Sequence, residues 1–96
     1  MKCVKCSFEF EEKELQCSHD IPKYLGGTDK DGRHWLCLKC HKEYERLILK
    51  ECLESVGEEY QEEEELSWMK ELSNQAELLK LKFRMKAQQI KESFYG

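Results

Sequence analysis

The feature that most constrains this chain is a pair of Cys-x-x-Cys motifs. Cys3 and Cys6 form the first motif, and Cys37 and Cys40 form the second. Zinc prefers four soft ligands in a tetrahedron, and one Cys-x-x-Cys turn presents two sulfurs to it. Where thiols stay reduced, such pairs bind metal more readily than they form disulfides. The two motifs therefore predict one structural Zn²⁺ held by four thiolates.

The segment between the motifs predicts the fold around this ion. Residues 15–21 are expected to form a strand, residues 22–32 a loop rich in turn-forming residues, and residues 34–36 the second strand of a hairpin. From about Leu38, apolar residues recur at spacings of three and four, which predicts a helix that Gly57 should end. A knuckle, a hairpin and a helix around one zinc ion are typical of treble-clef domains.

The composition changes after Gly57. Residues 51–65 contain eight glutamates and no basic residue, so we interpret residues 57–65 as an acidic linker or the start of a helix. Residues 66–96 carry apolar side chains every three or four positions, which predicts a long amphipathic helix. This helix either folds back on the first one or forms a coiled coil with a second copy or a protein partner. We thus expect an α+β chain, with a zinc domain over residues 1–56 followed by the linker and the helix.

The composition limits both the core and the partners. Of the 96 residues, 38% are charged, so the core is small, and zinc binding would supply folding free energy that it lacks. The N-terminus has no apolar run of the signal-peptide kind, and no stretch is long enough to span a membrane. We therefore expect a cytoplasmic protein without membrane contact. The net charge of −4 argues weakly against a nucleic-acid binder, although residues 1–50 carry ten Lys+Arg against nine Asp+Glu.

A second pattern accompanies the cysteines. It consists of His19-Asp20-Ile21-Pro22, of Leu25-Gly26-Gly27 and of Leu36-Cys37-Leu38-Lys39-Cys40-His41. Together with the cysteine pairs, it resembles the HNH endonuclease family over roughly residues 3–45. The resemblance implies a ββα-metal fold in which a histidine of the first strand activates water. It also implies a divalent cation, held partly by the helix, that binds the scissile phosphate of DNA.

Carried over to this chain, the resemblance assigns His19 as the general base, because a neutral imidazole can take a proton from water near pH 7. His41 and Glu45 are then the helix ligands of a catalytic Mg²⁺ or Mn²⁺, since they lie one helical turn apart. Asp20 is a further candidate metal ligand, and His34 is a candidate catalytic residue that assists the base. An alternative register makes His19 the metal ligand and places Asp20 at the base position.

Two positions depart from the family's pattern. Ser18 occupies the place of a metal-ligating Asp or His, and Gly32 the place of the Asn that orients the base. Losing a ligand weakens metal binding, and losing the amide leaves the general base less firmly oriented.

The leading hypothesis remains a DNA endonuclease, with Lys23, Arg33 and Lys42 as nucleic-acid-binding residues. The alternative is a non-catalytic zinc module that binds nucleic acid or a protein partner, with the C-terminal helix mediating assembly.

Overall fold

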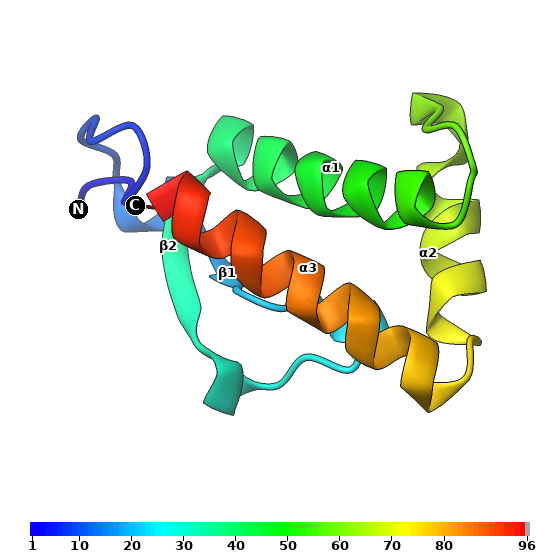
Figure 1. Cartoon of the computed structure of the whole chain (residues 1–96). Helices are drawn as coiled ribbons and strands as arrows, with labels where there is room; N and C mark the ends of the chain where they lie inside the picture. Colours follow the sequence, from blue (N-terminus) through cyan, green and yellow to red (C-terminus); the bar gives the residue numbers. More distant parts are fainter. Residues whose placement is uncertain (96) are drawn as a thin grey trace.

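The computed structural model describes residues 1–95 and has the expected α+β architecture (Figure 1). An N-terminal knuckle (residues 2–10) leads into a two-stranded antiparallel hairpin, which three helices follow. The strands are β1 (Leu15–His19) and β2 (Arg33–Cys37), and the helices are α1 (Leu38–Ser55), α2 (Glu65–Ser73) and α3 (Glu77–Tyr95). Single turns of 3₁₀ helix lie at Glu12–Glu14, Lys23–Leu25, Asp29–Asp31 and Glu62–Glu64.

The hairpin register decides which polar side chains face the helices. Ser18 of β1 lies opposite His34 of β2, and His19 lies opposite Arg33. Directly paired residues share one face of an antiparallel sheet, and neighbours along a strand point to opposite faces. Ser18 and His34 therefore share a face that His19 does not. The knuckle is attached to β2, because the Val4 amide donates a 3.0 Å hydrogen bond to the main-chain oxygen of Trp35.

Helix α1 begins directly after β2 and ends where the sequence predicts. Gly57 adopts a left-handed φ of 77°, and the amide of Glu58 bonds back to the Leu53 oxygen at 2.9 Å. This pattern is a common helix C-terminus that favours glycine. Tyr44, Ile48 and Cys52 line the buried face of the helix, as their spacing indicated.

The C-terminal segment differs from the single helix expected over residues 66–96. Helix α2 stops at Ser73, and α3 starts at Glu77 after a short turn. The Ser73 hydroxyl donates to the Lys70 oxygen at 2.7 Å, and the Asn74 amide donates to the Glu71 oxygen at 3.1 Å. Such local polar contacts compete with helix propagation. The turn lets α3 run back along α1. Of the two predicted arrangements, fold-back on the first helix and a coiled coil with another chain, the structure shows the fold-back.

One hydrophobic core joins both parts of the chain. Its members come from the knuckle, the hairpin and all three helices, and they include three cysteines of the two Cys-x-x-Cys motifs: Cys3, Leu15, Ile21, Leu25, Leu36, Cys37, Cys40, Tyr44, Ile48, Leu49, Cys52, Leu53, Leu72, Phe83, Ala87 and Phe94. Helix α3 is thus part of the folded core rather than an appended arm. No helix within residues 1–95 combines the length and apolarity that crossing a membrane requires.

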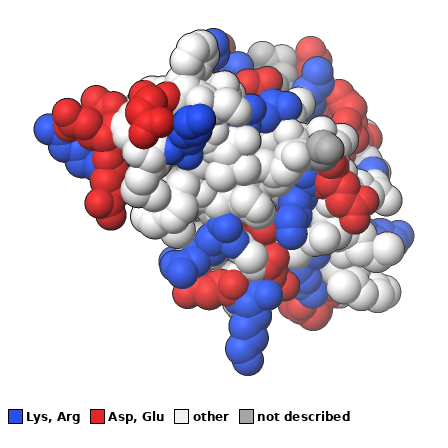
Figure 2. Space-filling view, turned by 90° about the vertical axis from the view of Figure 1, so that its left-hand side faces the viewer, with Lys and Arg blue, Asp and Glu red and all other residues white. Residues whose placement is uncertain are grey.

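The end of the molecule that carries the knuckle has an uncharged centre. Figure 2 shows this end, with a broad area free of charge and with acidic and basic side chains around it. The exposed large apolar side chains of the knuckle and of the elements next to it include Met1, Val4, Phe8, Trp35 and Leu38.

Candidate metal centre and its polar surroundings

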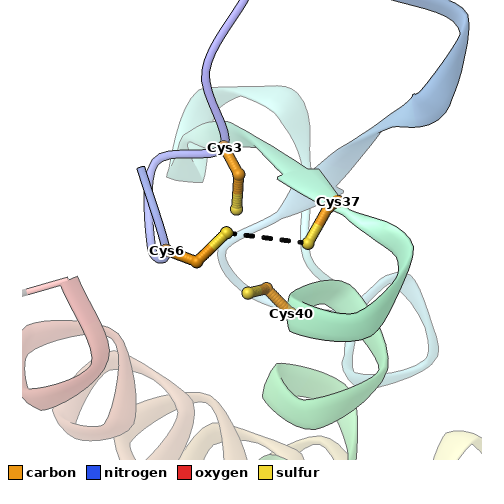
Figure 3. Close-up of side chains that lie close together, drawn as sticks. All are labelled: Cys3, Cys6, Cys37 and Cys40. Carbon is orange, nitrogen blue, oxygen red and sulfur yellow. Dashed lines mark hydrogen bonds between the residues drawn. The ribbon is translucent and has the colours of Figure 1, made fainter. Parts of the chain in front are cut away.

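The four cysteines of the two motifs converge as predicted. Their sulfur atoms all lie within 4.8 Å of one another. Figure 3 shows the side chains pointing toward a common centre, with Cys6 and Cys37 sulfurs 4.0 Å apart. With Zn–S bonds of about 2.3 Å, tetrahedral thiolates lie roughly 3.8 Å apart. Because only a small contraction is needed and all four donors are sulfur, this group fits one zinc ion.

The backbone around Cys3 and Cys6 forms a closed turn and stabilises the Cys3 thiolate. Ser7 adopts a left-handed φ of 64°, and its amide donates to the Cys3 oxygen at 2.9 Å, which closes the turn. Burial opposes ionisation of Cys3, but main-chain amides of Cys6, Cys37 and Lys5 stabilise its thiolate. Its pKa is thereby lowered to about 6. This sulfur is ready to bind metal, because the thiolate is the ligand form.

The two remaining cysteines lie outside the cluster. Cys52 is fully buried in the core, and burial raises the pKa of its thiol to about 12. Cys17 is half-buried on β1, opposite Trp35. Both are free thiols. Four thiolates leave zinc no open position, so an ion in the cluster has a structural role.

The predicted general base, His19, pairs with a loop carboxylate. Its Nε2–H donates to Asp29 Oδ1 at 2.7 Å, and the pKa of Asp29 is lowered by this bond and by Arg33. Nδ1 of His19 is then the nitrogen with the free lone pair. Asp29 was not a candidate from the sequence, because nothing in its spacing links it to His19.

The two predicted helix ligands lie side by side. His41 Nε2 is 3.4 Å from Glu45 Oε1, and His41 Nδ1 is buried without a hydrogen-bond partner. Within residues 1–95, the four cysteines are the group of three or more His, Cys, Asp or Glu ligand atoms that lies close enough for a metal ion. The structure therefore brings His41 and Glu45 together, but it does not gather them with His19 or Asp20 into a preformed site.

Asp20 and His34 belong to a buried polar cluster that includes α3. The Asp20 side chain is fully buried, His34 Nδ1 donates to its Oδ1, and Lys91 Nζ lies 3.0 Å from its Oδ2. The Tyr44 hydroxyl donates to the Asp20 main-chain oxygen at 2.5 Å. The other side of the His34 ring stacks on Tyr95, with centroids 4.1 Å apart. Helix α3 thus covers the hairpin face that carries Asp20 and His34.

Gly32 is required by this cluster. Its φ is 109°, and a Cβ atom there would lie 2.3 Å from Asp20 Oδ2. Its main-chain oxygen also accepts a 3.0 Å hydrogen bond from the Asp20 amide. The place at which the HNH pattern has an Asn therefore leaves no room for a side chain while Asp20 keeps its position.

The predicted nucleic-acid-binding residues lie on separate elements. Lys23 and Arg33 are near Asp29, whose pKa both of them lower. Lys42 lies on α1, in a shallow surface hollow that Glu45 and other acidic side chains also line. Each of these three cations thus has a carboxylate near it, and the three do not form one basic patch.

A groove beside the four-cysteine cluster was not expected from the sequence. We call it the knuckle groove; its volume is about 770 Å³, and its lining includes Phe8, Phe10, Gln16, Leu38, Lys39 and Glu43. Phe8 is 70% exposed at its edge, although it follows directly on the metal-binding turn. Cys6, Cys37 and Cys40 also line the groove, so a metal ion in the cluster would fix its walls.

Comparisons of the chain with models of protein families, with curated proteins and with solved structures returned no match. The resemblance to HNH endonucleases therefore rests on the residues quoted for it above. The structure defines the chain as an α+β domain with a four-cysteine cluster suited to one metal ion.

Proposed function

We propose that this chain is a non-catalytic zinc module that binds a protein partner through the knuckle groove. The observation that carries the proposal is the exposure of Phe8 and Leu38 at the edge of a groove whose walls include three zinc ligands. Contiguous exposed apolar surface marks interaction sites in proteins of this kind. A metal-held wall also limits the conformational entropy lost on binding.

The groove carries charges of both signs and lacks the excess of cations that a nucleic-acid site needs. Its lining contains Lys5 and Lys39 beside Glu14 and Glu43, and the neighbouring residues 9–13 add three glutamates and one lysine. DNA binding relies on Lys and Arg that neutralise phosphates. A surface without an excess of cations attracts a phosphate backbone weakly, so the groove suits a protein better than DNA.

The polar cluster supports a non-catalytic role. Asp20 is fully buried and already engaged by His34 and Lys91. His34 is further held by its stack on Tyr95. Groups fixed in this way stabilise the packing of α3 on the hairpin, and full burial separates Asp20 from a cation bound to a substrate at the surface.

A photo-crosslinking amino acid at position 8 tests this function. In cells of the source organism, we expect it to capture a defined protein, and Leu38→Asp should abolish capture. Leu66→Asp is the matched control, because Leu66 is exposed on α2 away from the groove. Capture that ignores Leu38→Asp, or a salt-dependent DNA complex of the purified protein in its place, would contradict the proposal.

A nuclease is the second candidate, because the His19–Asp29 pair gives the predicted base an orienting carboxylate. In this role Nδ1 of His19 would accept a proton from water, and Asp29 would hold the ring. His41 and Glu45 would bind Mg²⁺ or Mn²⁺, which polarises the phosphate.

A cleavage assay tests this candidate. The purified protein should nick plasmid DNA with either ion. His19→Ala should abolish nicking and Asp29→Asn weaken it, with zinc content unchanged. No cleavage with either ion would exclude this candidate.

A further inference from the structure

Strand β1 has a main-chain edge that no other described part of the chain pairs. The Asp20 amide donates to the Gly32 oxygen at 3.0 Å, and bonded positions alternate along an antiparallel ladder. Ser18, two residues earlier, therefore turns its N–H and C=O groups toward β2. Cys17 and His19 turn theirs away from β2, and within residues 1–95 none of these groups has a hydrogen-bond partner.

The outer edge of β2 differs from this edge, because the knuckle covers it. The main-chain oxygen of Trp35 points outward and accepts the 3.0 Å hydrogen bond from the Val4 amide. Cys17 lies directly opposite Trp35 in the hairpin, but its outward groups meet no such segment. Buried main-chain groups almost always have hydrogen-bond partners, so the unpaired groups of β1 face solvent.

Strand β1 also lacks the features that usually keep a free edge from pairing. Monomeric proteins protect such edges with lysines, prolines or bulges. The sequence Leu-Gln-Cys-Ser-His contains neither lysine nor proline. The ladder runs without a bulge from the Leu15–Cys37 pair to the His19–Arg33 pair. The edge is therefore a regular template for one more strand.

This edge is complementary to a second copy of itself. A two-fold axis at Ser18 would set Cys17 of each copy opposite His19 of the other. Each such pair exchanges both of its main-chain hydrogen bonds, so every unpaired group of the two edges would find a partner. Gln16 would then face Asp20 of the second copy, so the register brings no like charges together.

A neighbouring register fits less well. An axis at Cys17 would set His19 opposite Leu15, whose amide already donates to the Glu12 oxygen. It would also bring Glu14 opposite Asp20 of the second copy, and like charges placed directly opposite are unfavourable. The axis at Ser18 is thus the register that the free groups and the charges favour.

We propose that two copies of the chain pair through β1, antiparallel and about an axis at Ser18, so that their hairpins form one continuous sheet. The contact joins identical surfaces, so it closes as a symmetric dimer and does not extend into a chain. It uses a surface other than the knuckle groove, so it goes beyond the proposed function and does not depend on it. A contact of this size gives a weak dimer.

Sedimentation velocity of the zinc-loaded full chain tests the proposal. The wild type should shift from monomer to dimer as its concentration rises to about millimolar. Cys17→Pro should stay monomeric, because proline removes an outward N–H without removing a bond to β2. Cys17→Thr keeps that N–H and should dimerise like the wild type. Cys17→Lys also keeps it, but brings two ammonium groups together near the axis, and should weaken the dimer most at low salt.

Hydrogen exchange identifies the surface that pairs. The amides of Cys17 and His19 should gain protection as the wild-type concentration rises, and they should not in Cys17→Lys. Circular dichroism and zinc content should be equal for all variants, which separates lost pairing from lost folding. If Cys17→Pro does not fold, Cys17→Lys decides the question.

A wild type that remains monomeric at about millimolar concentration would overturn the proposal. So would dimers that persist in both Cys17→Pro and Cys17→Lys, or association that leaves the exchange of the Cys17 and His19 amides unchanged. Protection of these amides by a different protein, bound to a monomeric chain, would assign the edge to another occupant and overturn it too. Capture of a protein by the crosslinker at position 8 tests the knuckle groove separately, so either idea can fail without the other.

Discussion

Lys5 and Phe94, at opposite ends of the chain, are joined by two contacts. The Lys5 ammonium donates a hydrogen bond to the Phe94 main-chain oxygen at 2.9 Å and lies 4.6 Å from the centre of the Phe94 ring. Lys5 lies between Cys3 and Cys6 of the four-cysteine cluster. Metal binding and the docking of α3 are thus physically connected, because the turn that holds the metal also holds the helix end.

We expect Lys5→Ala to destabilise the fold by about 1 kcal/mol, since it removes a hydrogen bond and a cation near a helix C-terminus. The midpoint of urea unfolding measures this loss. Lys13→Ala is the matched control and should change stability little, because Lys13 is exposed and pairs only with Glu11. Equal effects of the two substitutions would show that the Lys5–Phe94 contact contributes nothing.

Asp20→Ala should destabilise the fold by about 3 kcal/mol. The substitution leaves Lys91 without its carboxylate and His34 without its acceptor in a part-buried site. Denaturant unfolding monitored by tryptophan fluorescence measures the change. Replacing the exposed carboxylate of Asp31, which accepts hydrogen bonds from Thr28, by alanine is the comparison and should cost less. A stability like that of wild type in Asp20→Ala would mean that the cluster does not hold α3.

Gly32→Asn restores the residue type of the HNH pattern, and we expect it to harm the protein rather than activate it. The new Cβ would meet Asp20 Oδ2 in a left-handed backbone. A loss of at least about 2 kcal/mol in unfolding free energy, with no plasmid nicking, is the expected result. Wild-type stability together with metal-dependent cleavage would instead favour the nuclease candidate.

Thiol labelling should distinguish the two cysteines outside the metal cluster. In zinc-loaded protein at pH 8, iodoacetamide should modify Cys17, which is half-buried, much faster than Cys52. Cys52 has no exposed surface, and a thiol of pKa about 12 is almost entirely protonated at that pH. Mass spectrometry of peptides after timed labelling gives both rates. Comparable rates would contradict the packing of Cys52 in the core.

Local signals made much of the fold predictable. The two Cys-x-x-Cys motifs fixed the four-cysteine cluster, and apolar periodicity with Gly57 fixed α1 and its end. Turn-forming residues between the motifs likewise indicated the hairpin. The break between α2 and α3 escaped prediction, because Ser73 and Asn74 interrupt a helix without interrupting its apolar spacing.

Contacts between distant residues explain what the sequence did not reveal about the site. No spacing in the sequence links Lys91 to Asp20, yet the two side chains meet across the fold. Lys5 and Phe94 likewise lie at opposite ends of the chain, and no spacing links them. The sequence made Asp20 a candidate metal ligand and His34 a candidate catalytic residue. Their contacts with Lys91 and Tyr95 depend on the packing of α3, which no local pattern reveals.

The central claim is that one zinc ion in the four-cysteine cluster holds the knuckle, the hairpin and α3 together. Native mass spectrometry of the intact chain, followed by hydrogen exchange after chelation, tests it most directly. We predict one zinc ion per chain, and after chelation a loss of protection in the Lys91–Tyr95 part of α3 as well as in the knuckle. A chain that binds no zinc, or that keeps full protection of α3 without it, would contradict the account.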